Sequence, residues 1–189
     1  HLLMSQAVKM YKSEKIDSFI NENYQNKNIH VLTEDVPSGT AGALKLHKDK
    51  LDSSFAVING DTWFESDVSI SSLDLGSSIA GLVLTKIKDA SRYGSVKVST
   101  SGKVEAFLEK GKQNNNKDNL INVGSYIFSN EIISYIKYIP SSLENDLFPE
   151  LANDNLISGW ITDGNFIDIG IPESLAYARA NREFFNNEI

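Results

Sequence analysis

Hydrophobic and polar residues follow two periods along this chain, one typical of strands and one typical of helices. Runs that are apolar at nearly every position predict buried strands, and the run 55–58 is expected to be central with both faces covered. Segments with apolar residues on one side predict helices over residues 7–21, 41–47 and 130–139. The predicted strands cover residues 2–4, 29–32, 55–58, 79–87, 95–98, 103–108, 120–128, 157–161 and 166–169.

Turn-forming residues indicate how some of these elements are connected. Ser101-Gly102 and Asp163-Gly164 each separate two predicted strands and are typical of hairpin turns. Ser141 followed by Glu144 predicts a capping box, and Pro172 suits the first turn of a last helix. Strands and helices alternate first and hairpins mix with helices later, which indicates an α/β sandwich with a mixed sheet.

Composition narrows the class of protein without identifying it. The 189 residues suit a single domain, and 41% hydrophobic with 23% charged residues is ordinary for a globular protein. A formal net charge of -7 without a basic run excludes a typical nucleic-acid partner. The chain has no cysteine, no signal-peptide pattern and no apolar stretch long enough to span a membrane, which fits a cytoplasmic protein.

Two acidic residues lie at or inside predicted apolar strands. Asp61 ends Asn59-Gly60-Asp61 directly after a strand, where open α/β sheets bind ligands. Asp168 lies within the strand 166–169, where an unpaired carboxylate is costly. Together they could hold one Mg²⁺, which takes one or two carboxylates plus phosphate oxygens and water. Taken alone, the first is also a common turn and the second a polar residue on a half-exposed strand.

Other segments could bind anionic ligands. Small residues at 37–43 precede a predicted helix, so their backbone amides should be exposed to an anion or a base, although no Walker lysine follows. Polar or glycine-containing segments stand at Arg92-Tyr93-Gly94, Glu109-Lys110 and Asn122-Val123-Gly124. On its own, each of these segments is more often a helix start, a turn or a solvated charge.

Taken together, six segments resemble the sugar nucleotidyltransferase family and occur in the family's order over nearly the whole chain. They are residues 34–43 (EDVPSGTAGA), 57–61 (VINGD), 92–96 (RYGSV), 107–110 (FLEK), 122–126 (NVGSY) and 166–173 (FIDIGIPE). Ser38 stands where the family usually has leucine, and Val123 is bulkier than the family's alanine or glycine.

This resemblance implies a Rossmann-like three-layer α/β/α sandwich with a mixed, mainly parallel sheet. It implies attack by a sugar 1-phosphate on the α-phosphorus of a nucleoside triphosphate, with Mg²⁺ as cofactor. The implied metal ligands are Asp61 and Asp168, which form the catalytic set together with Lys110. The implied nucleotide-binding residues are Pro37, Gly39, Thr40, Asn59 and Gly60. The implied sugar-phosphate-binding residues are Tyr93, Gly94, Glu109, Lys110, Asn122 and Gly124.

Within the family, segments 59–64, 92–94 and 166–170 are most similar to short bacterial enzymes that activate heptose or related sugar 1-phosphates with GTP. The family's glycine-rich phosphate loop, with its arginine and lysine, has no counterpart in the sequence. We therefore expect residues 1–189 to form a single nucleotidyltransferase domain that is incomplete at its N-terminus. The sequence does not set the oligomeric state and is compatible with a homo-oligomer.

Two other functions remain compatible with the sequence. A non-catalytic relative that binds a nucleotide sugar and regulates a partner would explain the lack of the phosphate loop, although it would not need Asp61 and Asp168. A metal-dependent glycosyltransferase would use a nucleotide-sugar donor. Such enzymes usually place two acids around the metal at one strand end, whereas Asp61 is followed by Thr62 and Trp63.

Overall fold

The computed structural model describes residues 5–9, 13–24, 29–65, 69–108 and 119–183. The chain folds into two compact units. One unit comprises His1–Lys50 with Ile133–Leu147, and the other comprises Leu51–Ile132 with Phe148–Ile189.

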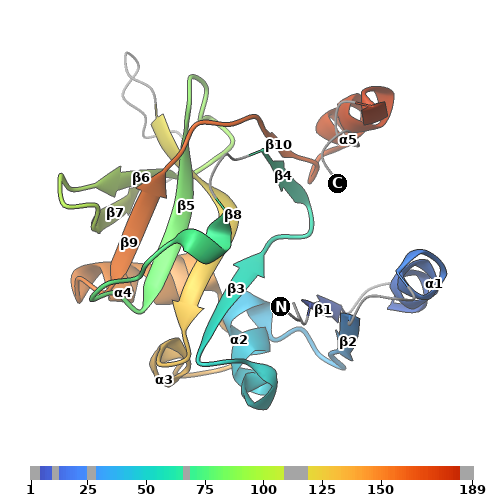
Figure 1. Cartoon of the computed structure of the whole chain (residues 1–189), viewed down its shortest axis with the longest axis horizontal. Coiled ribbons are helices and arrows are strands. Elements are labelled where there is room, and N and C mark those ends of the chain that lie inside the picture. Colours follow the sequence, from blue (N-terminus) through green and yellow to red (C-terminus); the bar gives the residue numbers. More distant parts are fainter. Residues whose placement is uncertain (1–4, 10–12, 25–28, 66–68, 109–118, 184–189) are drawn as a thin grey trace. The chain divides into compact units, whose positions relative to one another are not determined.

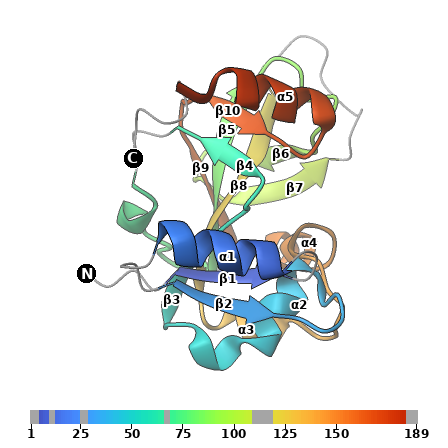
Figure 2. The ribbon, with the colours of Figure 1, turned by 90° about the vertical axis from the view of Figure 1, so that its right-hand side faces the viewer.

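The first unit contains a β–α–β arrangement. Strands β1 (Ser5–Lys9) and β2 (Ile29–Thr33) pair in parallel, and helix α1 (Ser13–Asn23) lies along them (Figure 2). The sequence predicts a helix from residue 7, but β1 occupies that position and the helix begins at Ser13. The cause is the backbone ladder with β2, because long-range pairing of this kind overrides local apolar spacing. The strand predicted at 2–4 lies outside the described residues.

Three further helical elements are short. Helix α2 (Gly39–Leu46) matches the prediction and is followed by a 3₁₀ turn at Lys48–Lys50. The helix predicted over 130–139 is reduced to α3 (Ile132–Tyr135).

A one-turn π-helix, Leu143–Leu147, is capped one residue later than the sequence predicts. The Oγ of Ser142 accepts the Asn145 N–H at 3.2 Å, and the Asp146 carboxylate accepts the Ser142 N–H at 2.7 Å. Ser141 is therefore not the capping residue. Its carbonyl oxygen instead accepts the N–H groups of Ala41 and Gly42 in α2.

The second unit is built on a six-stranded sheet. Strand β8 (Asn119–Ser129) pairs antiparallel with β5 (Ala80–Ile87), which runs parallel to β9 (Ile157–Ile161) (Figure 1). β8 also pairs with β3 (Ser54–Ile58) and β6 (Ser95–Val98), and β6 forms the predicted hairpin with β7 (Val104–Leu108). The remaining elements are the strands β4 (Thr62–Phe64) and β10 (Phe166–Asp168) and the helices Ile70–Ser72, α4 (Phe148–Asn153) and α5 (Pro172–Ala180).

Aromatic side chains fill the core of the second unit. Tyr126 and Phe128 project from β8, Phe148 begins α4, and all three are at most 1% exposed. Their ring centroids lie 5.3 to 6.2 Å apart. Because such clusters dominate the energetics of a core, they hold β8 firmly in the sheet. β8 in turn positions two of the predicted site residues, Asn122 and Gly124.

Three expectations about strand pairing differ from the structure. Strand β3 is not a central strand covered on both faces, since its described partner is the antiparallel β8 and Ile58 is 63% exposed. Asp163-Gly164 does not close a hairpin, because β9 pairs with β5 whereas β10 pairs with β4. The sheet structure is mixed as expected, but five of the seven described ladders are antiparallel, so parallel pairing does not predominate.

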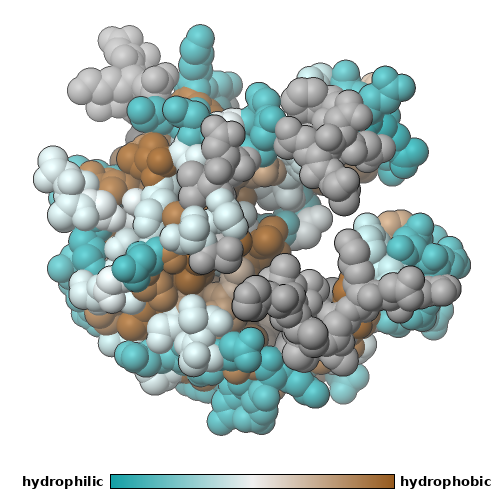
Figure 3. Space-filling model, in the orientation of Figure 1, coloured by the Kyte–Doolittle hydropathy of each residue, from teal (hydrophilic) through white to brown (hydrophobic). Residues whose placement is uncertain are grey.

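The surface combines polar residues with separate hydrophobic ones. Figure 3 shows brown residues scattered among teal and white ones on the face that it presents. The exposed large side chains include Val36, Ile58, Ile161 and Tyr177. Over the described ranges, no helix combines the length and the apolar character needed to cross a membrane.

Candidate functional site

The antiparallel pair β4–β10 brings the two predicted metal ligands together. Asp61 directly precedes β4, and Asp168 ends β10 opposite Thr62. The Ile169 N–H donates to the carbonyl oxygen of Asp61 at 2.9 Å. This bond joins the two segments one residue beyond the β4–β10 pairing. Two acids far apart in sequence thus stand at one end of a small sheet.

The carboxylates of these acids face a common space beside Gly170. A Cβ built on Gly170 would lie 2.8 Å from Oδ1 of Asp168 and 3.8 Å from Oδ2 of Asp61. Glycine therefore leaves open a position within reach of both side chains. The Gly170 N–H donates to Oδ1 of Asp168 at 2.6 Å, which orients that carboxylate.

This arrangement fits a hard divalent cation such as Mg²⁺. Both groups offer oxygen ligands, and Asp61 is exposed while Asp168 is half-buried, so both are open to a ligand. Across the described ranges, no three His, Cys, Asp or Glu side chains cluster as a metal site. The protein would thus supply two carboxylates and leave the other coordination positions to phosphate oxygens and water.

A cation to which the sequence pattern gave no separate role also reaches Asp168. Nη2 of Arg92 lies 3.6 Å from Oδ2 of Asp168. The guanidinium carbon is 5.4 Å from the centroid of the Tyr93 ring, which meets Phe166 of β10 edge-to-face at 5.3 Å. Burial raises the pKa of the Tyr93 phenol, so this side chain stays neutral at physiological pH. The local sequence marks residues 92–94 as a segment, but it carries no signal that Arg92 pairs with Asp168.

Asn59, Asn122 and Gly124 form one connected group. The Asn59 N–H donates to the Gly124 carbonyl at 2.8 Å, and the Gly124 N–H donates to Oδ1 of Asn122 at 2.9 Å. Nδ2 of Asn122 donates to the Tyr126 hydroxyl at 2.8 Å. Both ends of the Asn122 amide are therefore engaged within β8, which makes this residue a support for the backbone at Gly124. Val123, the bulkier departure from the family pattern, is 1% exposed and packs in the core.

Gly94, another predicted sugar-side residue, lies beside the end of β7. A Cβ on Gly94 would be 3.1 Å from the carbonyl oxygen of Leu108, the last residue of β7. Glu109 and Lys110 follow directly and lie outside the described residues. Gly60 is exposed, and a Cβ there would meet no atom within 4 Å.

The predicted nucleotide segment belongs to the first unit and is largely engaged by its own unit. Gly39 has φ +76°, and a Cβ there would lie 2.3 Å from the carbonyl oxygen of Ser141. That oxygen accepts the N–H groups of Ala41 and Gly42 at 2.9 and 3.1 Å, so these two amides are not open to an anion as expected. The Thr40 hydroxyl accepts the Leu143 N–H at 2.9 Å. Pro37, Gly39 and Thr40 are nevertheless exposed.

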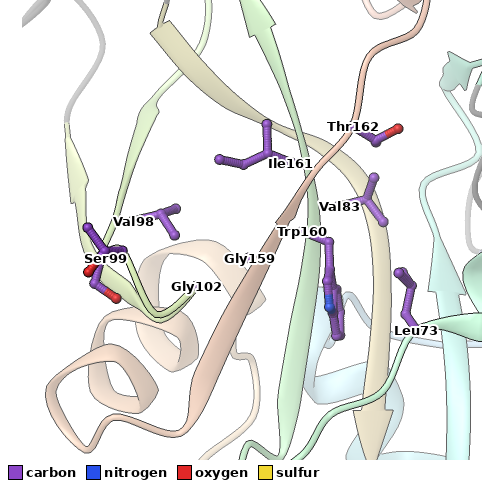
Figure 4. A pocket seen from close by; sticks show the side chains of 10 residues that line it. Leu73, Val83, Val98, Ser99, Gly102, Gly159, Trp160, Ile161 and Thr162 are labelled. Atoms are coloured by element: carbon purple, nitrogen blue, oxygen red, sulfur yellow. The ribbon is translucent and has the colours of Figure 1, made fainter.

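A cavity of about 370 Å³ lies elsewhere in the second unit (Figure 4). Leu73, Val83, Val98 and Trp160 form much of its wall, and the described residues that line it carry no charged side chain. Because phosphate groups need cations or backbone amides, this cavity is a poor candidate for the phosphates of a nucleotide. Among the predicted site residues that the structure describes, none lines it.

Comparison with known proteins assigns the chain to a family. A family model described as nucleotidyl transferase matches residues 5–183. The chain belongs to this family. The predicted family is thereby confirmed, and the similar solved structures confirm its Rossmann-like α/β class.

Two similar proteins are sugar-1-phosphate guanylyltransferases. Mannose-1-phosphate guanyltransferase of Neurospora crassa is 32% identical over 173 residues, which are 86% of this chain and 47% of that protein. D-glycero-alpha-D-manno-heptose 1-phosphate guanylyltransferase of Campylobacter jejuni is 33% identical over 167 residues, which are 86% of this chain and 72% of that protein. The chain thus spans about half the length of the fungal relative.

Two solved structures are also similar to this chain. HddC from Yersinia pseudotuberculosis is 33% identical with a TM-score of 0.78, over 95% of this chain and 77% of that one. The structure of HddC complexed with GMP-PN is 33% identical with a TM-score of 0.75, over 93% of this chain and 76% of that one.

Proposed function

We propose that this chain takes part in guanylyl transfer, in which a sugar 1-phosphate and GTP give a GDP-sugar and pyrophosphate. The observation that carries the proposal is the pair of carboxylates, Asp61 and Asp168, beside the open position at Gly170. The fungal and bacterial guanylyltransferases support the choice of GTP. We assign the reaction to the cytoplasm, as a step that supplies precursors for surface polysaccharide or another glycan.

The reaction transfers the α-phosphorus of GTP from the oxygen of pyrophosphate to an oxygen of the sugar phosphate. An oxygen of the sugar phosphate forms a bond to the α-phosphorus of GTP, the bond to the bridging oxygen breaks, and pyrophosphate leaves with that electron pair. Asp61 and Asp168 would hold Mg²⁺, which supplies charge neutralisation at the phosphate oxygens. Little covalent chemistry is left to the protein, so its residues act through binding, orientation and charge.

The binding roles follow the family segments, with one adjustment. We assign the nucleotide to Pro37, Gly39, Thr40, Asn59 and Gly60. We assign the sugar phosphate to Tyr93, Gly94, Glu109, Lys110 and Gly124, with Lys110 as the cation on this side. Asn122 joins this set as a support for Gly124, because its Oδ1 accepts the Gly124 N–H and its Nδ2 donates to the Tyr126 hydroxyl.

A heptose 1-phosphate is the proposed acceptor. The support is the similarity of segments 59–64, 92–94 and 166–170 to short bacterial enzymes of this kind, together with the Campylobacter jejuni relative at 33% identity. The family match favours nucleotidyl transfer over glycosyl transfer. A non-catalytic relative that binds a nucleotide sugar is the second candidate. This candidate does not explain why the two carboxylates lie together.

Pyrophosphate release by the complete protein tests the proposal. The assay combines Mg²⁺ with GTP, UTP, dTTP or CTP, and with heptose 1-phosphate or mannose 1-phosphate. We expect turnover with GTP and a loss of about 100-fold or more in Asp61→Asn and Asp168→Asn, because a catalytic metal contributes several kcal/mol.

Asp163→Asn provides the matched control, since Asp163 is an exposed acid in the turn that precedes β10. Its activity should equal that of the unmodified protein. A preference for a pyrimidine nucleotide would refute the choice of GTP. Nucleotide-sugar binding without any turnover would support the regulatory candidate instead.

A further inference from the structure

Arg92 holds one oxygen of Asp168 through a contact that is easily exchanged. Its Nη2 lies 3.6 Å from Oδ2, which is an ion pair longer than an ordinary hydrogen bond. The side chains are 40% and 26% exposed, and ion pairs so open to water are weak. A stronger ligand for Oδ2 would therefore displace the guanidinium at little cost.

The other side of Asp168 is fixed in a different way. Oδ1 accepts the Gly170 N–H at 2.6 Å. The two oxygens of one carboxylate thus have separate partners, a backbone amide and an arginine. The amide cannot move away, whereas the arginine side chain can.

The backbone around Arg92 is anchored while its head group remains free to turn. The Tyr93 N–H donates to the Ala90 carbonyl at 2.9 Å, and the Ser91 N–H donates to the Asp89 carboxylate at 2.9 Å. The guanidinium carbon lies 5.4 Å from the centroid of the Tyr93 ring. Arg92 is therefore placed beside the carboxylate pair by a structured turn.

We propose that Arg92 is a positioning residue that exchanges partners during the reaction. It pairs with Asp168 until a divalent cation occupies that carboxylate, and it then binds the phosphate oxygens of the nucleotide or of pyrophosphate. The exchange follows from charge, because an arginine and a divalent cation repel each other when they share one carboxylate. A guanidinium also matches phosphate oxygens well, with two parallel N–H donors. This inference rests on the proposed function, since it needs the metal at Asp61 and Asp168.

Opposite effects on two binding constants distinguish this role from a merely structural one. The probe is Mn²⁺, whose binding to the complete protein is followed by electron paramagnetic resonance without nucleotide. We expect Arg92→Met to bind Mn²⁺ roughly tenfold more tightly, because the competing positive charge is gone. Calorimetry with saturating Mn²⁺ should show roughly tenfold weaker binding of pyrophosphate by the same variant.

Two further variants complete the experiment. Arg92→Lys keeps the charge and should restore the Mn²⁺ affinity, but it should restore pyrophosphate binding only in part, because lysine lacks the planar fork. Arg179→Met removes an exposed arginine near the end of α5 and is expected to leave both affinities unchanged. Thermal unfolding of each variant checks that the fold is intact.

The outcomes separate the inference from the proposed function. If the unmodified protein binds no Mn²⁺ at millimolar concentration, or binds it as well after Asp168→Asn, the metal site itself is wrong. If Mn²⁺ binding depends on Asp168 but Arg92→Met weakens it or leaves it unchanged, only the partner exchange is wrong. Weaker binding of both Mn²⁺ and pyrophosphate would show that Arg92 merely supports the local structure.

Discussion

Replacing Gly170 with alanine should damage the carboxylate pair while sparing the fold. The added Cβ would lie 2.8 Å from Oδ1 of Asp168, whereas carbon–oxygen contacts are normally about 3.3 Å or longer. The Asp168 carboxylate must therefore move by roughly half an ångström and loosen its bond to the Gly170 N–H. The same methyl would stand 3.8 Å from Oδ2 of Asp61, within the space proposed for the metal.

The size of the effect can be set from this displacement. Misplacement of reacting groups by about 1 Å can cost about 100-fold in rate, so half that distance predicts a loss of about tenfold in kcat/KM. Gly170 is exposed and its φ lies outside the left-handed region. Alanine there should therefore change the free energy of unfolding by less than about 1 kcal/mol.

Three measurements on the Gly170→Ala protein test this reasoning. They are thermal unfolding, Mn²⁺ affinity and the rate of pyrophosphate release. The control for unfolding and metal affinity is Gly60→Ala, whose added Cβ meets no atom within 4 Å although it lies next to Asp61. If Gly170→Ala binds the metal and turns over as the unmodified protein does, the space beside Gly170 is not where the metal sits.

Two other glycines should behave in the opposite way and affect stability. Gly124→Ala combines φ +75° with a Cβ 2.7 Å from Nδ2 of Asn59, so urea unfolding should show a loss of about 1–3 kcal/mol. An unchanged midpoint would mean that the strand relaxes freely around Gly124. Gly81→Ala would place a Cβ 1.8 Å from the Trp160 ring, and the displaced ring should cost about 1–3 kcal/mol and change the tryptophan fluorescence. Gly76→Ala, where a Cβ meets nothing within 4 Å, is the control for strain from a positive φ alone.

Local sequence patterns correctly predict those strands and helices that depend on burial or on neighbouring residues. The apolar runs that indicate β5, β8 and β9 become strands because each is buried in the sheet of the second unit. The Ser101-Gly102 turn does join β6 and β7, since neighbouring strands of a hairpin need no distant partner. Pro172 likewise begins α5, as its fixed φ allows at a first helical position.

Patterns fail where the partner of a segment is distant in sequence. A turn such as Asp163-Gly164 indicates that the chain changes direction, but it cannot indicate that β9 joins β5 while β10 joins β4. The apolar run of β3 predicts burial on both faces, yet Ile58 is exposed. For the same reason the pairing of Arg92 with Asp168 could not be read from either segment.

The glycines of the family segments have different structural surroundings. Gly39 was expected to approach a nucleotide base, yet its positive φ and its contact with the Ser141 backbone already require glycine for the fold. Gly124 is required in the same way by Asn59. The atoms nearest to a Cβ on Gly170, in contrast, belong to the two carboxylates, and its φ would tolerate alanine. Backbone strain therefore does not require glycine here, and a side chain at this position would enter the space beside Asp61 and Asp168 that we propose for the metal.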